Sequence, residues 1–127
     1  MNVVAGVIER DGLILICQRK RGGRHPLKWE FPGGKVEPGE DSPSALVREL
    51  REELQIEARI GELIYSQTIR YSEGPPIYLQ FYWVTEFSCE PANLEFEQIV
   101  WEDRRKLPQY DFLAGDIEFV KMLANQS

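Results

Sequence analysis

The chain has 127 residues, with 15 Lys and Arg against 21 Asp and Glu, so its formal net charge is −6. This length and a hydrophobic content of 43% are typical of one domain with one core, and we expect a single domain over residues 1–127. The acidic balance argues against broad electrostatic binding to polymeric nucleic acid or to anionic membranes. A small anionic substrate is compatible with it if a metal ion neutralises the substrate.

The cysteines and the N-terminal residues bear on the compartment. Cys17 and Cys89 are too few and too scattered for a disulfide framework or a zinc site, so we expect free thiols. Charged residues at 9–11 interrupt the first apolar stretch, and no run approaches the roughly 20 apolar residues of a membrane span. We therefore expect no signal peptide, no membrane association and a cytoplasmic location.

The first third of the chain predicts a hairpin and then a long loop. Two β-branched apolar runs, near 2–9 and 13–19, flank an Asp-Gly pair, which is a strong hairpin signal. Residues 21–40 are rich in Gly and Pro and predict a loop with at most a short strand at 29–31. Ser42 offers an N-cap and Pro43 suits the first helical position, so we predict a helix over 43–54.

The rest of the chain predicts strands and a closing helix. Strands are expected near 56–70 and 77–87, and the second is apolar on both alternating sets, as expected of a strand covered on both faces. Residues 98–102 add a short strand, 106–112 form a loop, and 116–123 form a helix capped by Gly115 or Asp116. This order predicts an α/β fold with a mixed sheet between helices.

The predicted helix at 43–54 has an unusual acidic face. Glu49, Glu52 and Glu53 fall within about 100° of one another, and like charges at i,i+4 destabilise a helix by a few tenths of a kcal/mol. Such a face is either fully solvated or holds a cation, and Arg48 could orient Glu52 from four residues away. The neighbouring stripe, which would face the sheet, contains Leu46, Val47, Leu50 and Leu54.

The preceding loop favours the cation. Gly33 and Gly34 let the backbone approach a ligand, and the Gly34 carbonyl can bind a metal ion. Lys35 can contact a phosphate oxygen, and the turn at 38–39 brings Glu40 back towards the helix. Magnesium prefers hard oxygen ligands, usually carboxylates together with substrate phosphates.

Residues 34–56 resemble the signature of the Nudix hydrolases. The matching positions are Gly34, Glu40, Arg48, Glu49, Leu50, Glu52, Glu53 and Ile56. Gln55 departs from the signature, because the family normally has Gly there as a left-handed helix cap. We expect Gln55 either to cost about 1 kcal/mol or to change how the chain leaves the helix. The segments WEFPGGKVEPGE and WEDRRKLPQYDFLAGDIEFVKML extend the resemblance to the MutT-like branch over nearly the whole chain.

The resemblance implies a fold, a reaction and a set of roles. It implies the Nudix α/β/α sandwich and, for the MutT-like branch, Mg²⁺- or Mn²⁺-dependent attack of water at the β-phosphorus of a nucleoside triphosphate, giving monophosphate and pyrophosphate. Arg48 would hold a catalytic glutamate, Lys35 and Gly33 would meet the substrate, and Glu40 would orient its neighbours. The implied metal ligands are Gly34, Glu49, Glu52, Glu53 and Glu95, among which Glu52, Glu53 and Glu95 are also the candidate catalytic groups.

Other candidate residues have competing interpretations. Glu95 occupies a position where MutT-like members place a metal-binding or base-acting glutamate, although Glu97 lies close enough to be confused with it. Arg19, Phe31 and Asp116 match positions that contact the nucleobase. Arg19 could equally be a solvated residue, Phe31 a core residue and Asp116 a helix N-cap.

The leading functional hypothesis is a nucleoside triphosphate pyrophosphohydrolase, either sanitising nucleotides such as 8-oxo-dGTP or acting on CTP or dCTP, as a monomer or homodimer. The alternatives are a Nudix hydrolase of ADP-ribose or dinucleoside polyphosphates, and a Nudix module that binds nucleotides without catalysis. An ionised Asp116 only accepts hydrogen bonds, which suits the cytosine amino group better than O6 of 8-oxoguanine. On that assumption, Asp116→Asn would move preference towards 8-oxo-dGTP, whereas a buried, protonated Asp116 could donate a hydrogen bond and behave like Asn.

Overall fold

The computed structural model describes residues 1–126. Strand β1 (Asn2–Arg10) and strand β2 (Leu13–Gln18) form the predicted hairpin, whose register places Arg10 opposite Leu13. Asp11 and Gly12 make the turn with positive φ angles of 54° and 80°, a conformation that Gly and Asp tolerate better than most residues.

A mixed sheet organises the described residues. Its strand order is β3 (Trp29–Glu30), β2, β1, β6 (Ile77–Ser88) and β5 (Glu57–Ile69). Strand β4 (Gly33–Lys35) pairs with β1, and β7 (Gln98–Asp103) pairs with β2. Strands β1 and β6 run parallel, whereas the other pairs are antiparallel.

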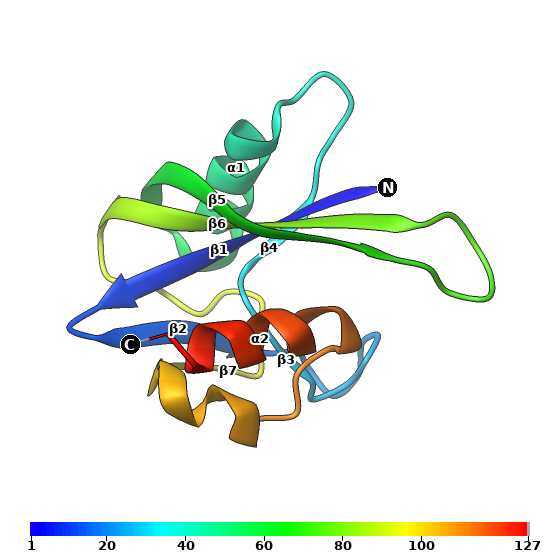
Figure 1. Ribbon diagram of the computed structural model, residues 1–127. Coiled ribbons are helices and arrows are strands. Elements are labelled where there is room, and N and C mark those ends of the chain that lie inside the picture. The colour runs from blue at the N-terminus through cyan, green and yellow to red at the C-terminus, as the bar shows by residue number, and fades with distance from the viewer. Residues whose placement is uncertain (127) are drawn as a thin grey trace.

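Helices α1 (Ser42–Leu54) and α2 (Ile117–Ala124) cover opposite faces of the sheet, so the predicted α/β/α sandwich is confirmed (Figure 1). Residues of β1 alternate between two cores, as strand geometry requires. The core under α1 includes Val4, Ile8, Leu15, Leu46, Leu50, Leu54 and Val84, and the core under α2 includes Ala5, Val7, Phe31, Phe81, Phe119, Val120 and Leu123.

Strand β6 contributes to both cores, as its double apolar pattern predicted: Phe81 lies under α2 and Val84 under α1. Cys17 is buried and Cys89 is exposed, and both are free thiols, as expected. Within residues 1–126, no helix has the length and apolar character needed to cross a membrane.

Three local predictions were wrong. Asp41, not Ser42, caps α1: its carboxylate accepts from the Ser44 amide at 2.8 Å, while the Ser42 hydroxyl donates to Gln80. Residues 33–35, predicted as loop, form β4. Residues 104–109, largely inside the loop predicted at 106–112, form a 3₁₀ helix capped by Asp103.

The chain also reaches α2 one residue later than predicted. A 3₁₀ turn (Ala114–Asp116) comes first, and α2 begins at Ile117. Asp116 occupies the N-cap position of α2, as predicted, but its side chain makes no capping hydrogen bond.

Candidate active site

Helix α1 presents its carboxylates on the face away from the core. Leu46, Leu50 and Leu54 are fully buried, which fixes the rotation of the helix and leaves the glutamates facing outward. Gln55 ends the helix in the left-handed conformation, with φ of 56° and ψ of 35°, and its amide donates to the Arg51 carbonyl at 3.0 Å. The unfavourable conformation expected at Gln55 is therefore present.

Arg48 connects this helix to the loop before it. Its Nε and Nη2 donate to the two oxygens of Glu40 at 2.8 and 3.0 Å, and its Nη2 also donates to the Lys35 carbonyl at 3.0 Å. Its Nη1 lies 3.4 Å from Glu52, so the expected pair is present, and it lies 2.9 Å from Glu49, which is the closer carboxylate. The guanidinium lowers the pKa of Glu40 to about 2.

Strand β4 places Gly33 and Gly34 close to the glutamates of helix α1. The Gly33 amide donates to Oε1 of Glu53 at 3.0 Å. A β-carbon on Gly34 would lie 2.5 and 2.7 Å from the two oxygens of Glu49. The carboxylate can therefore occupy this position only because residue 34 has no side chain. A β-carbon on Gly33 would overlap the Val4 carbonyl of β1. Both glycines therefore permit close contacts within the protein, with β1 and with Glu49, and their predicted approach to a ligand stays a prediction.

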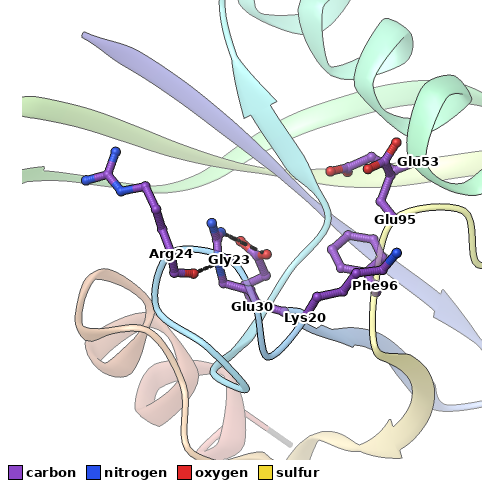
Figure 2. Close-up of a pocket in the computed structure, with 8 residues that line it drawn as sticks. Lys20, Gly23, Arg24, Glu30, Glu53, Glu95 and Phe96 are labelled. Atoms are coloured by element: carbon purple, nitrogen blue, oxygen red, sulfur yellow. Dashed lines mark hydrogen bonds and ion pairs between the residues drawn. The ribbon is translucent and has the colours of Figure 1, made fainter.

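The segment after β6 places Glu95 beside Glu53. The amides of Ala92 and Leu94 donate to the carbonyls of Leu54 and Glu53, at 2.8 and 3.2 Å, which fixes this segment to the end of α1. Figure 2 shows the carboxylates of Glu53 and Glu95 close to each other above Phe96.

Glu97 and Glu95 have different neighbours. The Glu97 carboxylate lies 3.9 Å from Arg21, and it does not line the cavity that Glu95 lines. Between these two residues, Glu95 is therefore the one placed near the helix carboxylates. Its role as a metal ligand or base stays a prediction.

Burial and neighbouring negative charges raise the pKa values of two α1 glutamates. Burial raises the pKa of Glu53 to about 9, and the charges of Glu49, Glu30 and Glu95 contribute to this rise. Burial likewise raises the pKa of Glu49. A bound cation would offset this repulsion and favour the ionised forms of both carboxyl groups.

The donor set suits a hard divalent cation. As the side chains lie, no three His, Cys, Asp or Glu residues among residues 1–126 converge to metal-binding distance. Arg48 engages Glu49, and the Gly33 amide engages Glu53. Rotation of these glutamates towards an ion would exchange those partners for a metal, and their oxygens are the ligands that Mg²⁺ and Mn²⁺ prefer.

A cavity of about 730 Å³ runs from Glu53 to an apolar end. Gly33, Gly34, Lys35 and Glu53 line one end. The other end is lined by Phe31, Ile69, Leu79, Leu113, Gly115 and Asp116, and the turn between β5 and β6 contributes Tyr71, Glu73, Gly74 and Pro75.

The three predicted base-contacting residues all line this cavity. Nη1 of Arg19 lies 3.1 Å from both oxygens of Glu30, and its Nε donates to the Arg24 carbonyl at 2.8 Å, so Arg19 is not a freely solvated residue. Phe31 is 2% exposed and stacks on Phe112, so it belongs to the core as well as to the cavity wall.

Asp116 is 5% exposed, and burial raises its pKa to about 8. The charge of Glu30 contributes to this rise, while a hydrogen bond from the Phe31 backbone opposes it. This rise favours the protonated form of Asp116 near pH 7, which is the alternative to the ionised form. Because a protonated carboxyl group both donates and accepts, Asp116 resembles Asn in its hydrogen bonding.

Sequence reasoning missed Glu30, although it lines the cavity and pairs with Arg19. A signal was available: Glu30 stands between Trp29 and Phe31, which are both buried, and alternation in an extended segment turns it to the other side. Lys20 and Arg24 were also missed as cavity residues.

Known proteins resemble this chain over nearly its whole length. A CTP pyrophosphohydrolase from Escherichia coli (strain K12) is 42% identical over 121 residues, which are 95% of this chain and 89% of that protein. An 8-oxo-dGTP diphosphatase from Haemophilus influenzae is 34% identical over 128 residues, which are 100% of this chain and 93% of that protein.

Solved structures agree. The solution structure of the E. coli ORF135 protein has a TM-score of 0.86 at 42% identity, covering 94% of this chain and 85% of that one. The crystal structure of a MutT NUDIX hydrolase from Burkholderia pseudomallei has a TM-score of 0.81 at 29% identity, covering 98% and 95%. The family description "NUDIX domain" matches residues 1–123. Together with the carboxylate helix and its glycine strand, these matches show that the chain belongs to the Nudix hydrolases, in their MutT-like branch.

Proposed function

We propose that this enzyme hydrolyses a nucleoside triphosphate to the monophosphate and pyrophosphate, with Mg²⁺ or Mn²⁺ as its cofactor. The observation that carries the proposal is a cavity lined both by Glu53 and Lys35 and by aromatic residues with the buried carboxyl group of Asp116. One end suits metal-bound phosphates, and the other has the size and polarity for a nucleobase. The matched relatives, named for CTP and 8-oxo-dGTP, support this choice.

Nudix hydrolases generally use a divalent metal, and the residues here fit one. Glu49, Glu53 and the Gly34 carbonyl would hold it, with Glu52 and Glu95 contributing directly or through water. The bound ion would lower the pKa of water and neutralise phosphate charge.

The other side chains orient and bind. Arg48, anchored by Glu40, keeps Glu49 towards β4, and Lys35 offers its ammonium group to a phosphate oxygen. Glu53 or Glu95 accepts the proton of the attacking water at a carboxylate oxygen.

The neutral Asp116 fits two kinds of base. Its hydroxyl can donate to N3 of cytosine while its carbonyl accepts from the N4 amino group, or the pair can meet O6 and N7–H of 8-oxoguanine. CTP, dCTP and 8-oxo-dGTP are therefore the proposed substrates. Hydrolysis of 8-oxo-dGTP would give the enzyme a role in removing damaged nucleotides from the cytoplasmic pool.

A nucleotide panel tests the function. The purified protein would be incubated with Mg²⁺ and each of CTP, dCTP, dGTP, 8-oxo-dGTP, ADP-ribose and a dinucleoside tetraphosphate, and products would be resolved by ion-exchange chromatography. We expect pyrophosphate with the highest kcat/KM from a cytosine or 8-oxoguanine triphosphate. Release of AMP from ADP-ribose as the fastest reaction, or no turnover at all, would contradict the proposal.

A further inference from the structure

The loop between β2 and β3 concentrates positive charge in an acidic protein. Five of the 15 Lys and Arg residues lie within residues 19–28. Three of them form ion pairs: Arg19 with Glu30, Arg21 with Glu97, and Lys28 with Asp111. Lys20 and Arg24 have no ion-pair partner within 4 Å in residues 1–126, so their charges are available to a ligand.

Lys20 lies at the edge of a second, smaller cavity. This cavity of about 230 Å³ is also lined by Glu53, Glu95 and Phe96. Figure 2 shows the Lys20 side chain extending towards Phe96, below the two carboxylates, whereas the Arg24 side chain extends to the opposite side. Lys20 is therefore the cation of this loop that approaches the metal-binding face.

The backbone around Lys20 is held in place. The Arg19 amide donates to the Lys28 carbonyl at 2.9 Å, and the Leu27 amide donates to the Arg19 carbonyl at 3.1 Å. The Gln18 side chain donates to the Leu27 carbonyl at 3.1 Å. The residue next to Lys20 is thus anchored at the end of β2, and only the lysine side chain must be ordered when it binds a ligand.

Glu53 shares one cavity with each of two lysines. It lines both cavities, whereas Lys35 lines only the larger one and Lys20 only the smaller one. A phosphate chain that enters from the nucleoside cavity and passes Glu53 meets Lys35 first and Lys20 beyond it. A strongly hydrated point charge such as a lysine ammonium suits a terminal phosphate, which carries the most negative charge.

We propose that Lys20 binds the terminal phosphate of the nucleotide and so selects triphosphates over diphosphates. This inference rests on the proposed triphosphate hydrolysis. It adds a specificity-determining residue that the Nudix signature segment does not contain, because Lys20 lies 14 residues before Gly34 in the sequence.

Steady-state kinetics with matched variants test the proposal. K20Q removes the charge, K20R preserves it, and R21Q removes one charge from the same loop at a residue that lines neither cavity. For the best triphosphate of the panel, we expect K20Q to lower kcat/KM about tenfold, mainly through KM, as for the loss of one charge-assisted hydrogen bond. K20R should recover most of this loss, and R21Q should stay within about twofold of wild type.

The matching nucleoside diphosphate, measured as a competitive inhibitor, provides the comparison. Its inhibition constant should change less than about twofold in K20Q, because it lacks the phosphate that Lys20 contacts. An equal loss for both nucleotides, or a similar loss in R21Q, would overturn the proposal in favour of a general electrostatic effect.

Calorimetric titration of inorganic pyrophosphate, with Mg²⁺ present, separates this inference from the proposed function. We expect K20Q to weaken pyrophosphate binding about tenfold while R21Q retains it. If wild-type protein released no pyrophosphate from any triphosphate, the proposed function would fail, and unchanged pyrophosphate binding in K20Q would independently reject the role of Lys20.

Discussion

The carboxylate of Glu49 occupies the space where a side chain on residue 34 would begin. We expect Gly34→Ala to displace Glu49 and to lower kcat/KM by about tenfold or more, as for the disturbance of a ligand's orientation. The fold should persist, because Glu49 is a half-buried side chain that can rotate. Gly22→Ala is the matched control, since a β-carbon there meets nothing within 4 Å. Equal activity of the two variants would contradict the role assigned to this contact.

Glu53→Gln should abolish most turnover without harming the fold. Gln cannot act as an anionic ligand or base, so we expect kcat to fall by about a hundredfold or more. Because the pKa of Glu53 is about 9 without metal, the wild-type side chain is neutral at pH 7, and a neutral Gln should leave the melting temperature unchanged or slightly higher. Calorimetric melting and product assays measure both effects, and near-normal kcat would reject the prediction.

Gln55→Gly should stabilise the protein. Gln55 has a φ of 56°, which costs a residue with a β-carbon about 1 kcal/mol more than it costs Gly. The gain should appear as a rise of about 4 °C in melting temperature at unchanged activity. Gln55→Ala serves as control, since alanine keeps the β-carbon and should give no such gain.

Asp116→Asn should change how stability depends on pH. The folded pKa of about 8 lies above the ordinary value of 3.8, so the folded state binds the proton more tightly than the unfolded state does. Wild-type stability therefore falls, through this group, as pH rises from about 4 to about 8. An amide at this position does not titrate. The free energy of unfolding of the variant minus that of wild type, from urea titrations, should therefore grow with pH across that window.

Ionisation of Asp116 should also change the base preference of the enzyme. Near pH 7 the neutral Asp116 resembles Asn, so the ratio of kcat/KM for 8-oxo-dGTP to that for dCTP should differ less than about threefold between wild type and Asp116→Asn. Above about pH 8 the wild-type carboxylate repels O6 of 8-oxoguanine, and this ratio should fall only in wild type. A pH-independent ratio in both proteins would show that the base is read elsewhere.

The regular elements and the acidic face could be predicted because they depend on local patterns. The spacing of Leu46, Leu50 and Leu54 fixes which face of α1 is buried, and Asp-Gly fixes the first turn. The cap was misplaced by one residue because Asp41 and Ser42 are both good N-caps, and only the position of Gln80 decides between them.

The remaining features depend on contacts between distant segments. Strand β4 exists because glycines let residues 33–35 approach β1 near the start of the chain, and no local pattern reports this pairing. The protonation of Asp116 follows from burial and from the charge of Glu30, which only the folded chain brings near it. Arg48 pairs with Glu52 as its spacing predicted, but helix spacing alone does not report its nearer partners Glu40 and Glu49.

Strand β1 is both a core strand and the floor of the nucleotide cavity. Val4 and Ala5 pack into the two opposite cores, and both also line the cavity. A substitution that reshaped this floor would disturb the packing on both sides of the sheet. The loop at residues 19–28 and the turn between β5 and β6 carry no such constraint. Substitutions that change substrate range among relatives of this chain should therefore accumulate in this loop and this turn, whereas the cavity-lining residues of β1 should change slowly.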